Sequence, residues 1–67
     1  MININNSLLE QVETLLEEHN IRCQTSQAPG HAASLWFYGM TRESDEEQAV
    51  SLIKEHFGPN AVLGGHA

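Results

Sequence analysis

Two stretches of the chain repeat apolar residues at the spacing of an α-helix. Over residues 8–19, five aliphatic side chains fall within an arc of about 120° on a helical wheel, namely Leu8, Leu9, Val12, Leu15 and Leu16. Glu10, Glu13 and Glu17 fall on the opposite side. Residues 45–57 repeat the apolar pattern with Ala49, Val50, Leu52, Ile53 and Phe57. The spacing predicts two amphipathic helices, each with one face buried and the other in water.

The ends of both stretches carry helix-terminating chemistry. Residues 7–10 and 44–47 each read as a capping box, in which a serine and a glutamate three positions later bond to the first turn. Asn5 also suits an N-cap. Asn20 suits a left-handed stop for the first helix, and the Gly-Pro pair at 58–59 suits the end of the second.

The remaining segments alternate as strands do. Residues 21–25 alternate apolar and polar, and residues 34–38 are rich in aromatic side chains. A Pro-Gly pair at 29–30 predicts a turn that joins them into a hairpin. The end segments 2–4 and 61–63 are short, but their apolar residues have nothing to pack against unless they too are strands.

With all four strands present, the order is βαββαβ, the ferredoxin-like plan. We therefore expect a small α+β, two-layer sandwich with two helices on one face of a 3–4-stranded antiparallel sheet. Without the end strands, a hairpin with two helices is left. The 67 residues have room for one domain, 1–67, in which residues 64–67 form a flexible tail.

Alternation along the hairpin assigns its side chains to two faces of the sheet. The helices should cover Ile21, Cys23, Leu35 and Phe37. The uncovered face should carry Arg22, Gln24, Trp36 and Tyr38. Exposed Trp and Tyr side chains are typical anchors of a contact with a partner or with a second copy of the chain. The alternative is that both rings lie flat over polar neighbours and contact nothing else.

The net charge of the chain limits the kinds of partner that it is expected to bind. Nine acidic residues face three cations, which gives a net charge of -6. The acids gather in or next to the two predicted helices, at Glu10, Glu13, Glu17, Glu18, Glu43, Asp45, Glu46, Glu47 and Glu55. Such a field attracts basic proteins and repels nucleic acid and anionic membranes. Solubility alone explains most of these acids, but Glu17 and Glu18 sit at the negative end of the helix dipole, which favours a role in binding.

Catalytic and metal-binding signatures are missing from the sequence. The four histidines show no zinc-type spacing, and Cys23 has no second cysteine. Antiparallel helices would place His31 beside His56 and His66 beside His19, which gives two ligands where zinc takes three or four. A core-facing Cys23 would be an inert thiol. We therefore expect no enzyme activity, no cofactor and no metal.

No stretch reads as a signal peptide or a membrane span, so a cytoplasmic protein is expected. The leading hypothesis is a non-enzymatic inhibitor or regulator that occludes a basic surface of a larger protein, such as a surface that holds nucleic acid. In size and charge the chain is like the small acidic inhibitors that phages make against host defence systems, or like antitoxins. The residues expected to bind the partner are Trp36, Tyr38, Arg22, Glu10, Glu13, Glu17, Glu18 and Glu47. The alternative is a small regulatory or ligand-binding homodimer.

Overall fold

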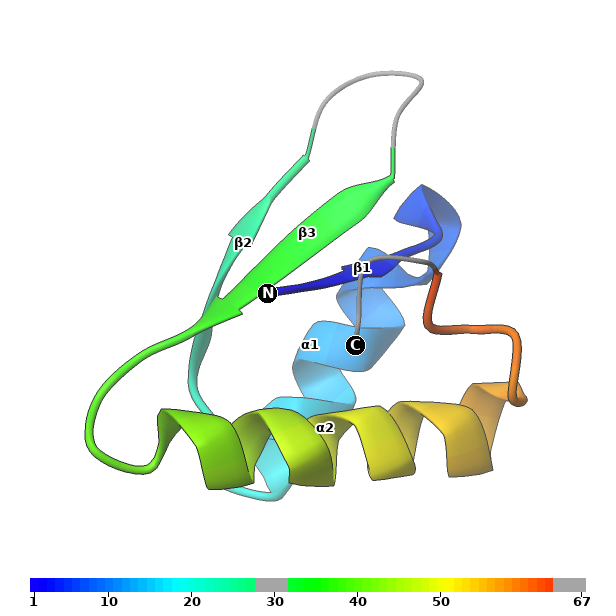
Figure 1. Ribbon diagram of the computed structural model, residues 1–67. Coiled ribbons are helices and arrows are strands. Elements are labelled where there is room, and N and C mark those ends of the chain that lie inside the picture. The colour runs from blue at the N-terminus through cyan, green and yellow to red at the C-terminus, as the bar shows by residue number, and fades with distance from the viewer. Residues whose placement is uncertain (28–31, 64–67) are drawn as a thin grey trace.

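The computed structural model describes residues 1–27 and 32–63. Along the chain follow β1 (Ile2–Ile4), a 3-10 helix (Asn6–Leu8), α1 (Leu9–Glu18), β2 (Cys23–Ser26), β3 (Ala33–Phe37) and α2 (Arg42–Phe57), as Figure 1 shows. The predicted turn at 29–30, His31 and the tail with His66 lie outside the described residues.

The three strands form an antiparallel sheet in the order β1-β3-β2. In the register, Ile2 lies opposite Leu35 and Gln24 opposite Trp36. Both hairpin strands are shifted from their predicted ranges. β2 begins two residues later than expected, and β3 ends before Tyr38, which therefore belongs to the connection into α2.

The predicted strand at 61–63 is reduced to one bridge. Val62 pairs with Ile4, and the Leu63 N–H donates to the Asn3 carbonyl at 2.8 Å. The Ala61 N–H donates instead to the Gly58 carbonyl at 3.1 Å, in the turn that leaves α2, so little of the segment is free to extend along β1. The described residues thus form a small α+β fold with two helices and a three-stranded antiparallel sheet, and the complete βαββαβ order is not confirmed.

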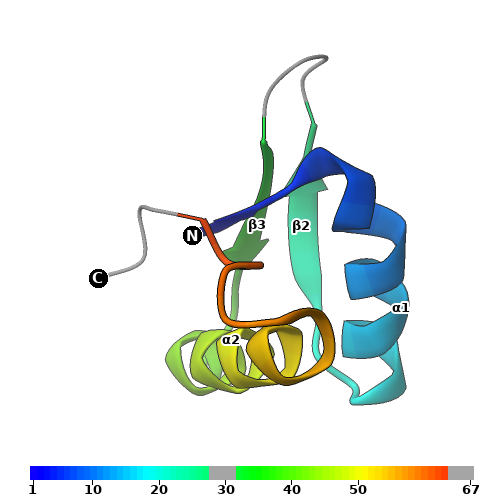
Figure 2. The ribbon, with the colours of Figure 1, turned by 90° about the vertical axis from the view of Figure 1, so that its right-hand side faces the viewer.

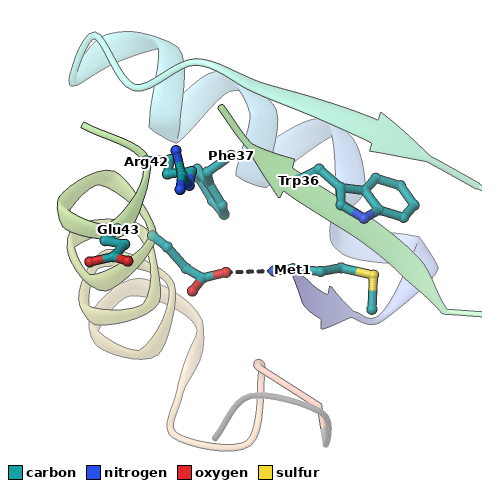
Figure 3. Close-up of a pocket in the computed structure, with 6 residues that line it drawn as sticks. Met1, Trp36, Phe37, Arg42 and Glu43 are labelled. Atoms are coloured by element: carbon teal, nitrogen blue, oxygen red, sulfur yellow. Dashed lines mark hydrogen bonds and ion pairs between the residues drawn. The ribbon is translucent and has the colours of Figure 1, made fainter. Parts of the chain in front are cut away.

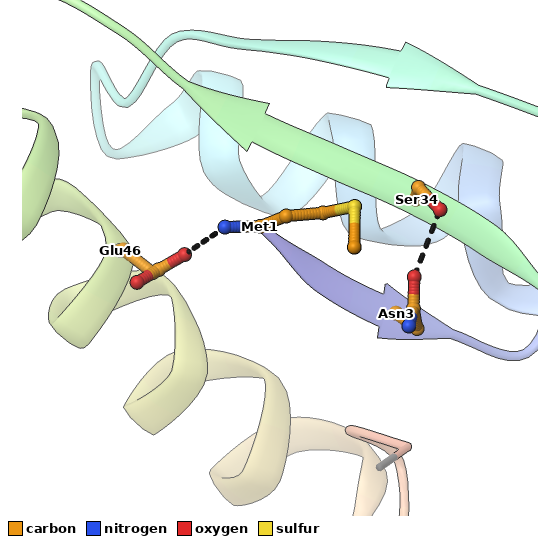
Figure 4. Close-up of polar contacts among 4 residues, drawn as sticks. All are labelled: Met1, Asn3, Ser34 and Glu46. Carbon is orange, nitrogen blue, oxygen red and sulfur yellow. Dashed lines mark hydrogen bonds and ion pairs between the residues drawn. The ribbon is translucent and has the colours of Figure 1, made fainter. Parts of the chain in front are cut away.

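One face of the sheet packs against the helices, as predicted. The largest fully buried side chains come from the sheet and both helices, namely Ile2, Ile4, Leu16, Leu35, Ile53 and Val12. On the other face, the Ser34 hydroxyl donates to the Asn3 side chain at 2.8 Å (Figure 4). The alternation between an apolar and a polar face therefore holds for β1 and β3.

The first helix starts differently from the prediction. The Asn5 side-chain oxygen accepts hydrogen bonds from the backbone N–H and the hydroxyl of Ser7, both at 3.0 Å. This contact caps the 3-10 turn that leads into α1. The N-cap of α1 itself is Leu8, with no side-chain capping bond, so the predicted Ser7–Glu10 capping box is wrong. The left-handed stop is confirmed, since Asn20 has φ 58°.

The second helix begins three residues before the predicted Asp45. Its N-cap is Thr41, whose hydroxyl donates to the Asp45 carboxylate at 2.9 Å. Ser44, the predicted N-cap, therefore lies inside the first turn of the helix, and the capping box at 44–47 is wrong. The helix ends as expected at Gly58, which has φ 104° and donates its N–H to the Lys54 carbonyl at 3.0 Å.

The two helices cross instead of running antiparallel (Figures 1 and 2). The C-terminal part of α1 lies beside α2 in both views. The antiparallel arrangement from which the positions of His19 and His56 were predicted is therefore wrong.

Candidate partner-binding surface

Exposed apolar side chains gather where β3 leads into α2. Among the described residues, five large hydrophobic side chains are exposed, namely Met1 (51%), Trp36 (42%), Tyr38 (52%), Met40 (102%) and Leu63 (38%). Three of them lie at alternate positions from the end of β3 through the connection. Met1 joins them because the pairing of Ile2 with Leu35 places it opposite Trp36. We call Met1, Trp36, Tyr38 and Met40 the β3–α2 corner.

A cavity of about 250 Å³ lies on one side of this corner, between the sheet and the start of α2. Met1, Trp36, Phe37, Arg42, Glu43 and Glu46 line it (Figure 3). The Met1 ammonium group forms an ion pair with Glu46 at 2.8 Å, which ties the start of β1 to α2 (Figure 4). The cavity combines apolar side chains from the sheet with charged side chains from the helix.

A second cavity, which we call the α1–β2 groove, lies on the other side of the corner and has a volume of about 300 Å³. Its lining residues are Glu13, Leu16, Glu17, Ile21, Arg22, Cys23 and Tyr38. Leu16 and Ile21 are buried in the core, whereas Glu13, Glu17 and Tyr38 are exposed. The groove therefore has an apolar base, and its walls carry two acids and the cation of Arg22.

The groove changes the predicted placement of two side chains. Arg22 and Tyr38 were expected beside Trp36 on the uncovered face of the sheet. Both lie outside the strands and line the groove together with residues of α1. Gln24 and Trp36, which pair across β2 and β3, are exposed as predicted. The physical reason is that alternation fixes a side chain's face only while the strand lasts.

The acids of α1 form no ion pair within the described part of the chain. Glu10, Glu13, Glu17 and Glu18 are exposed, as is Glu47 of α2. Within residues 1–27 and 32–63, the single ion pair is that of the Met1 ammonium group with Glu46. Three of the α1 acids surround a shallow depression of about 400 Å³ with Thr14. Asp45 and Glu46 are half-buried, whereas the other seven acids are exposed.

The thiol of Cys23 is half-buried at the wall of the groove. Burial raises its pKa above the ordinary value, and the negative charge of Glu13 raises it further. The neutral thiol is therefore favoured, which makes it a poor nucleophile and agrees with the prediction of an inert cysteine.

Alkylation by iodoacetamide near pH 8 should consequently be slower in the folded protein than in the urea-unfolded chain. Glu13→Gln should speed the reaction, and Glu18→Gln is the control that should not. Because the folded state holds the Cys23 proton to higher pH than the unfolded state, the free energy of unfolding should fall as pH rises above the unfolded thiol pKa. A folded thiol that reacts as fast as the unfolded one would contradict this account.

The histidines do not converge in the part of the chain that is described. His19 and His56 are both exposed. The His19 Nδ1 atom lies 3.0 Å from the Leu15 carbonyl oxygen, within its own helix. Within residues 1–27 and 32–63, no group of three or more His, Cys, Asp or Glu side chains is arranged to hold a metal ion.

Sequence reasoning missed part of this surface. Met1 and Met40 were not singled out, and neither was the cavity that Arg42, Glu43 and Glu46 share with Trp36. The signal for Met40 was present, since it continues the alternate spacing of Trp36 and Tyr38. The cavity depends on where α2 starts, which the capping pattern placed three residues too late.

No protein-family model, curated protein or solved structure matches the chain. Neither described helix combines the length and the apolar character that crossing a membrane requires.

Proposed function

We propose that this chain is a non-enzymatic, acidic protein-binding module that docks its β3–α2 corner on a basic surface of a larger protein. The observation that carries the proposal is the position of four exposed apolar side chains between two cavities whose walls contain acids. Binding energy in protein interfaces concentrates in a few aromatic or long side chains, surrounded by polar groups. Trp36 and Tyr38 are the anchors of this arrangement.

The acids supply the second half of the recognition. The exposed carboxylates of α1 and of Glu47 on α2 produce a field that speeds the encounter with a basic surface. Glu17 and Glu18 belong to this group although they lie at the unfavourable end of the α1 dipole. The module would occlude its partner by steric and electrostatic means, and a surface that normally holds nucleic acid is the natural target. Such a mode of action would be like that of phage inhibitors of host defence systems, or like that of antitoxins.

For the fold, we propose a ferredoxin-like domain in which the fourth strand is reduced to the Ile4–Val62 bridge. The competing proposal is a homodimer formed through the uncovered face with Trp36. Two copies of net charge -6 repel each other, which favours a different, basic partner. Light scattering separates the two, because a monomer at micromolar concentration disfavours the homodimer.

The proposal is tested first by position-specific crosslinking. A photoreactive amino acid replaces Trp36 in one variant, and in the control it replaces Asn60, an exposed residue three positions beyond the end of α2, whose C-terminal end lies away from the β3–α2 connection (Figure 1). We expect a specific protein to be captured from the source cell at position 36 and not at position 60. Equal capture at both positions would contradict docking through the corner.

Affinity for the captured, purified protein should then fall as salt rises. The Debye length shortens from about 10 Å at 0.1 M salt to about 3 Å at 1 M, so exposed carboxylates lose their reach. Calorimetric titrations over this range of NaCl should show Kd rising steadily. A Kd that does not change with salt would rule out a role for the acidic helices.

A further inference from the structure

The α1–β2 groove has the size of a subsite for one side chain. Its volume of about 300 Å³ lies at the bottom of the range of small-molecule pockets, roughly 300–1,000 Å³. The base of the groove is apolar, since Leu16 is 1% exposed and Ile21 is 4% exposed. A ligand that fits must therefore combine an apolar stem with a group that suits the walls.

The walls call for a cation. Glu13 and Glu17 are four residues apart on α1, so their carboxylates project from the same side of successive turns. Neither forms an ion pair within the described residues. The Glu13 charge also reaches across the groove to the opposite wall, where it contributes to the raised pKa of Cys23.

An arginine suits these walls better than a lysine. Its planar guanidinium group offers several N–H donors in one plane, which can bond to two carboxylates at once. It also stacks on aromatic rings, and Tyr38 presents its half-exposed ring at the edge of the groove. A lysine ammonium group is a more strongly hydrated point charge and lacks the planar face.

We propose that the α1–β2 groove receives one arginine side chain from a basic segment of the partner protein. The guanidinium lies between Glu13 and Glu17, and its methylene stem covers Leu16 and Ile21. The inference rests on the proposed function, because it names the chemistry of the partner at one part of the same surface.

Arg22 gives the proposal a distinctive consequence. It lines the groove, is exposed and has no ion-pair partner among the described residues, so its positive charge opposes an incoming arginine. Arg22→Gln should therefore tighten arginine binding, although it removes a charged residue from the surface. A groove that recognised an anion would respond in the opposite direction.

The test uses N-acetyl-arginine amide as the probe, followed by the backbone amide resonances of the full chain. We expect shifts confined to residues 13–23 and Tyr38, with a Kd on the order of 1–10 mM. The isosteric N-acetyl-citrulline amide, which has no charge, should cause much smaller shifts. Glu13→Gln and Glu17→Gln should each raise Kd roughly two- to fivefold. Glu55→Gln removes the same charge from an exposed position of α2, outside the groove lining, and should leave Kd unchanged.

Three results would overturn the inference: equal shifts with citrulline, shifts spread over both helices, or equal effects of the Glu17 and Glu55 variants. None of them would touch the proposed function if crosslinking at position 36 still captured a partner. Conversely, a chain that binds the arginine probe in the groove but captures no partner would refute docking through the corner.

Discussion

Leu35→Ala should lower the free energy of unfolding by about 3 kcal/mol, as is typical of truncating a fully buried leucine. Leu35 lies in the central strand, is completely buried, and faces Ile2 of β1 and Thr25 of β2 in the register. Its removal leaves a cavity between the sheet and the helices. A core of this size rarely supplies more than about 3–5 kcal/mol, so the variant should be largely unfolded in urea concentrations that the parent withstands. Circular dichroism during urea titration measures the difference.

Trp36→Ala is the matched control for this experiment, because it truncates the next residue of the same strand on the uncovered face. Its cost should stay below about 1 kcal/mol, as is usual for exposed positions. A loss equal to that of Leu35→Ala would mean that Trp36 is covered in solution, and the proposed docking surface would then not be free.

The sequence was sufficient for the helices because their signal is local. The aliphatic arc that contains Val12, Leu15 and Leu16 repeats with the helical period, and any amphipathic helix must bury such an arc. The helix starts were less predictable. Asn5 and Ser7 are both good N-cap residues, and similar local chemistry is available at Thr41 and Ser44. Tertiary packing decides between such competitors, so the boundary cannot be obtained from the pattern alone.

The candidate site depended on contacts that no local pattern contains. The groove combines residues of α1 with Tyr38, although β2 and β3 lie between Glu13 and Tyr38 in the sequence. Alternation correctly predicted that Trp36 is exposed. It also predicted Tyr38 on the same face of the sheet, which is wrong because β3 ends one residue earlier than predicted. A shift of one residue at a strand end thus moved one of the two aromatic anchors from the sheet face to the groove.

Truncation of either anchor should weaken partner binding more than any other surface change. Trp36→Ala and Tyr38→Ala should each cost about 2 kcal/mol of binding free energy, a rise in Kd of roughly 30-fold. Both rings are about half exposed in the free chain, so each still has surface to bury in a complex. Calorimetry with the crosslinked and purified partner gives the values, and Gln24→Ala, opposite Trp36 on the uncovered face, serves as the control that should change Kd little.

The double variant shows whether the two rings contact the partner independently. Trp36 and Tyr38 line separate cavities that share no residue. Changes at sites without shared contacts usually add, so the double variant should raise Kd by about 10³-fold. Clear sub-additivity would mean that both rings enter one pocket of the partner, which contradicts an interface that spans both cavities.

Salt separates the contribution of the rings from that of the acids. Removing Trp36 leaves every charge in place, so log Kd should keep the same dependence on salt while the whole curve moves to weaker binding. Glu13→Gln or Glu17→Gln should flatten that dependence with a smaller loss of affinity. If Trp36→Ala flattened the curve instead, the ring would act by positioning charged groups such as Glu43 and Glu46 across its cavity, and it would not be an anchor in its own right.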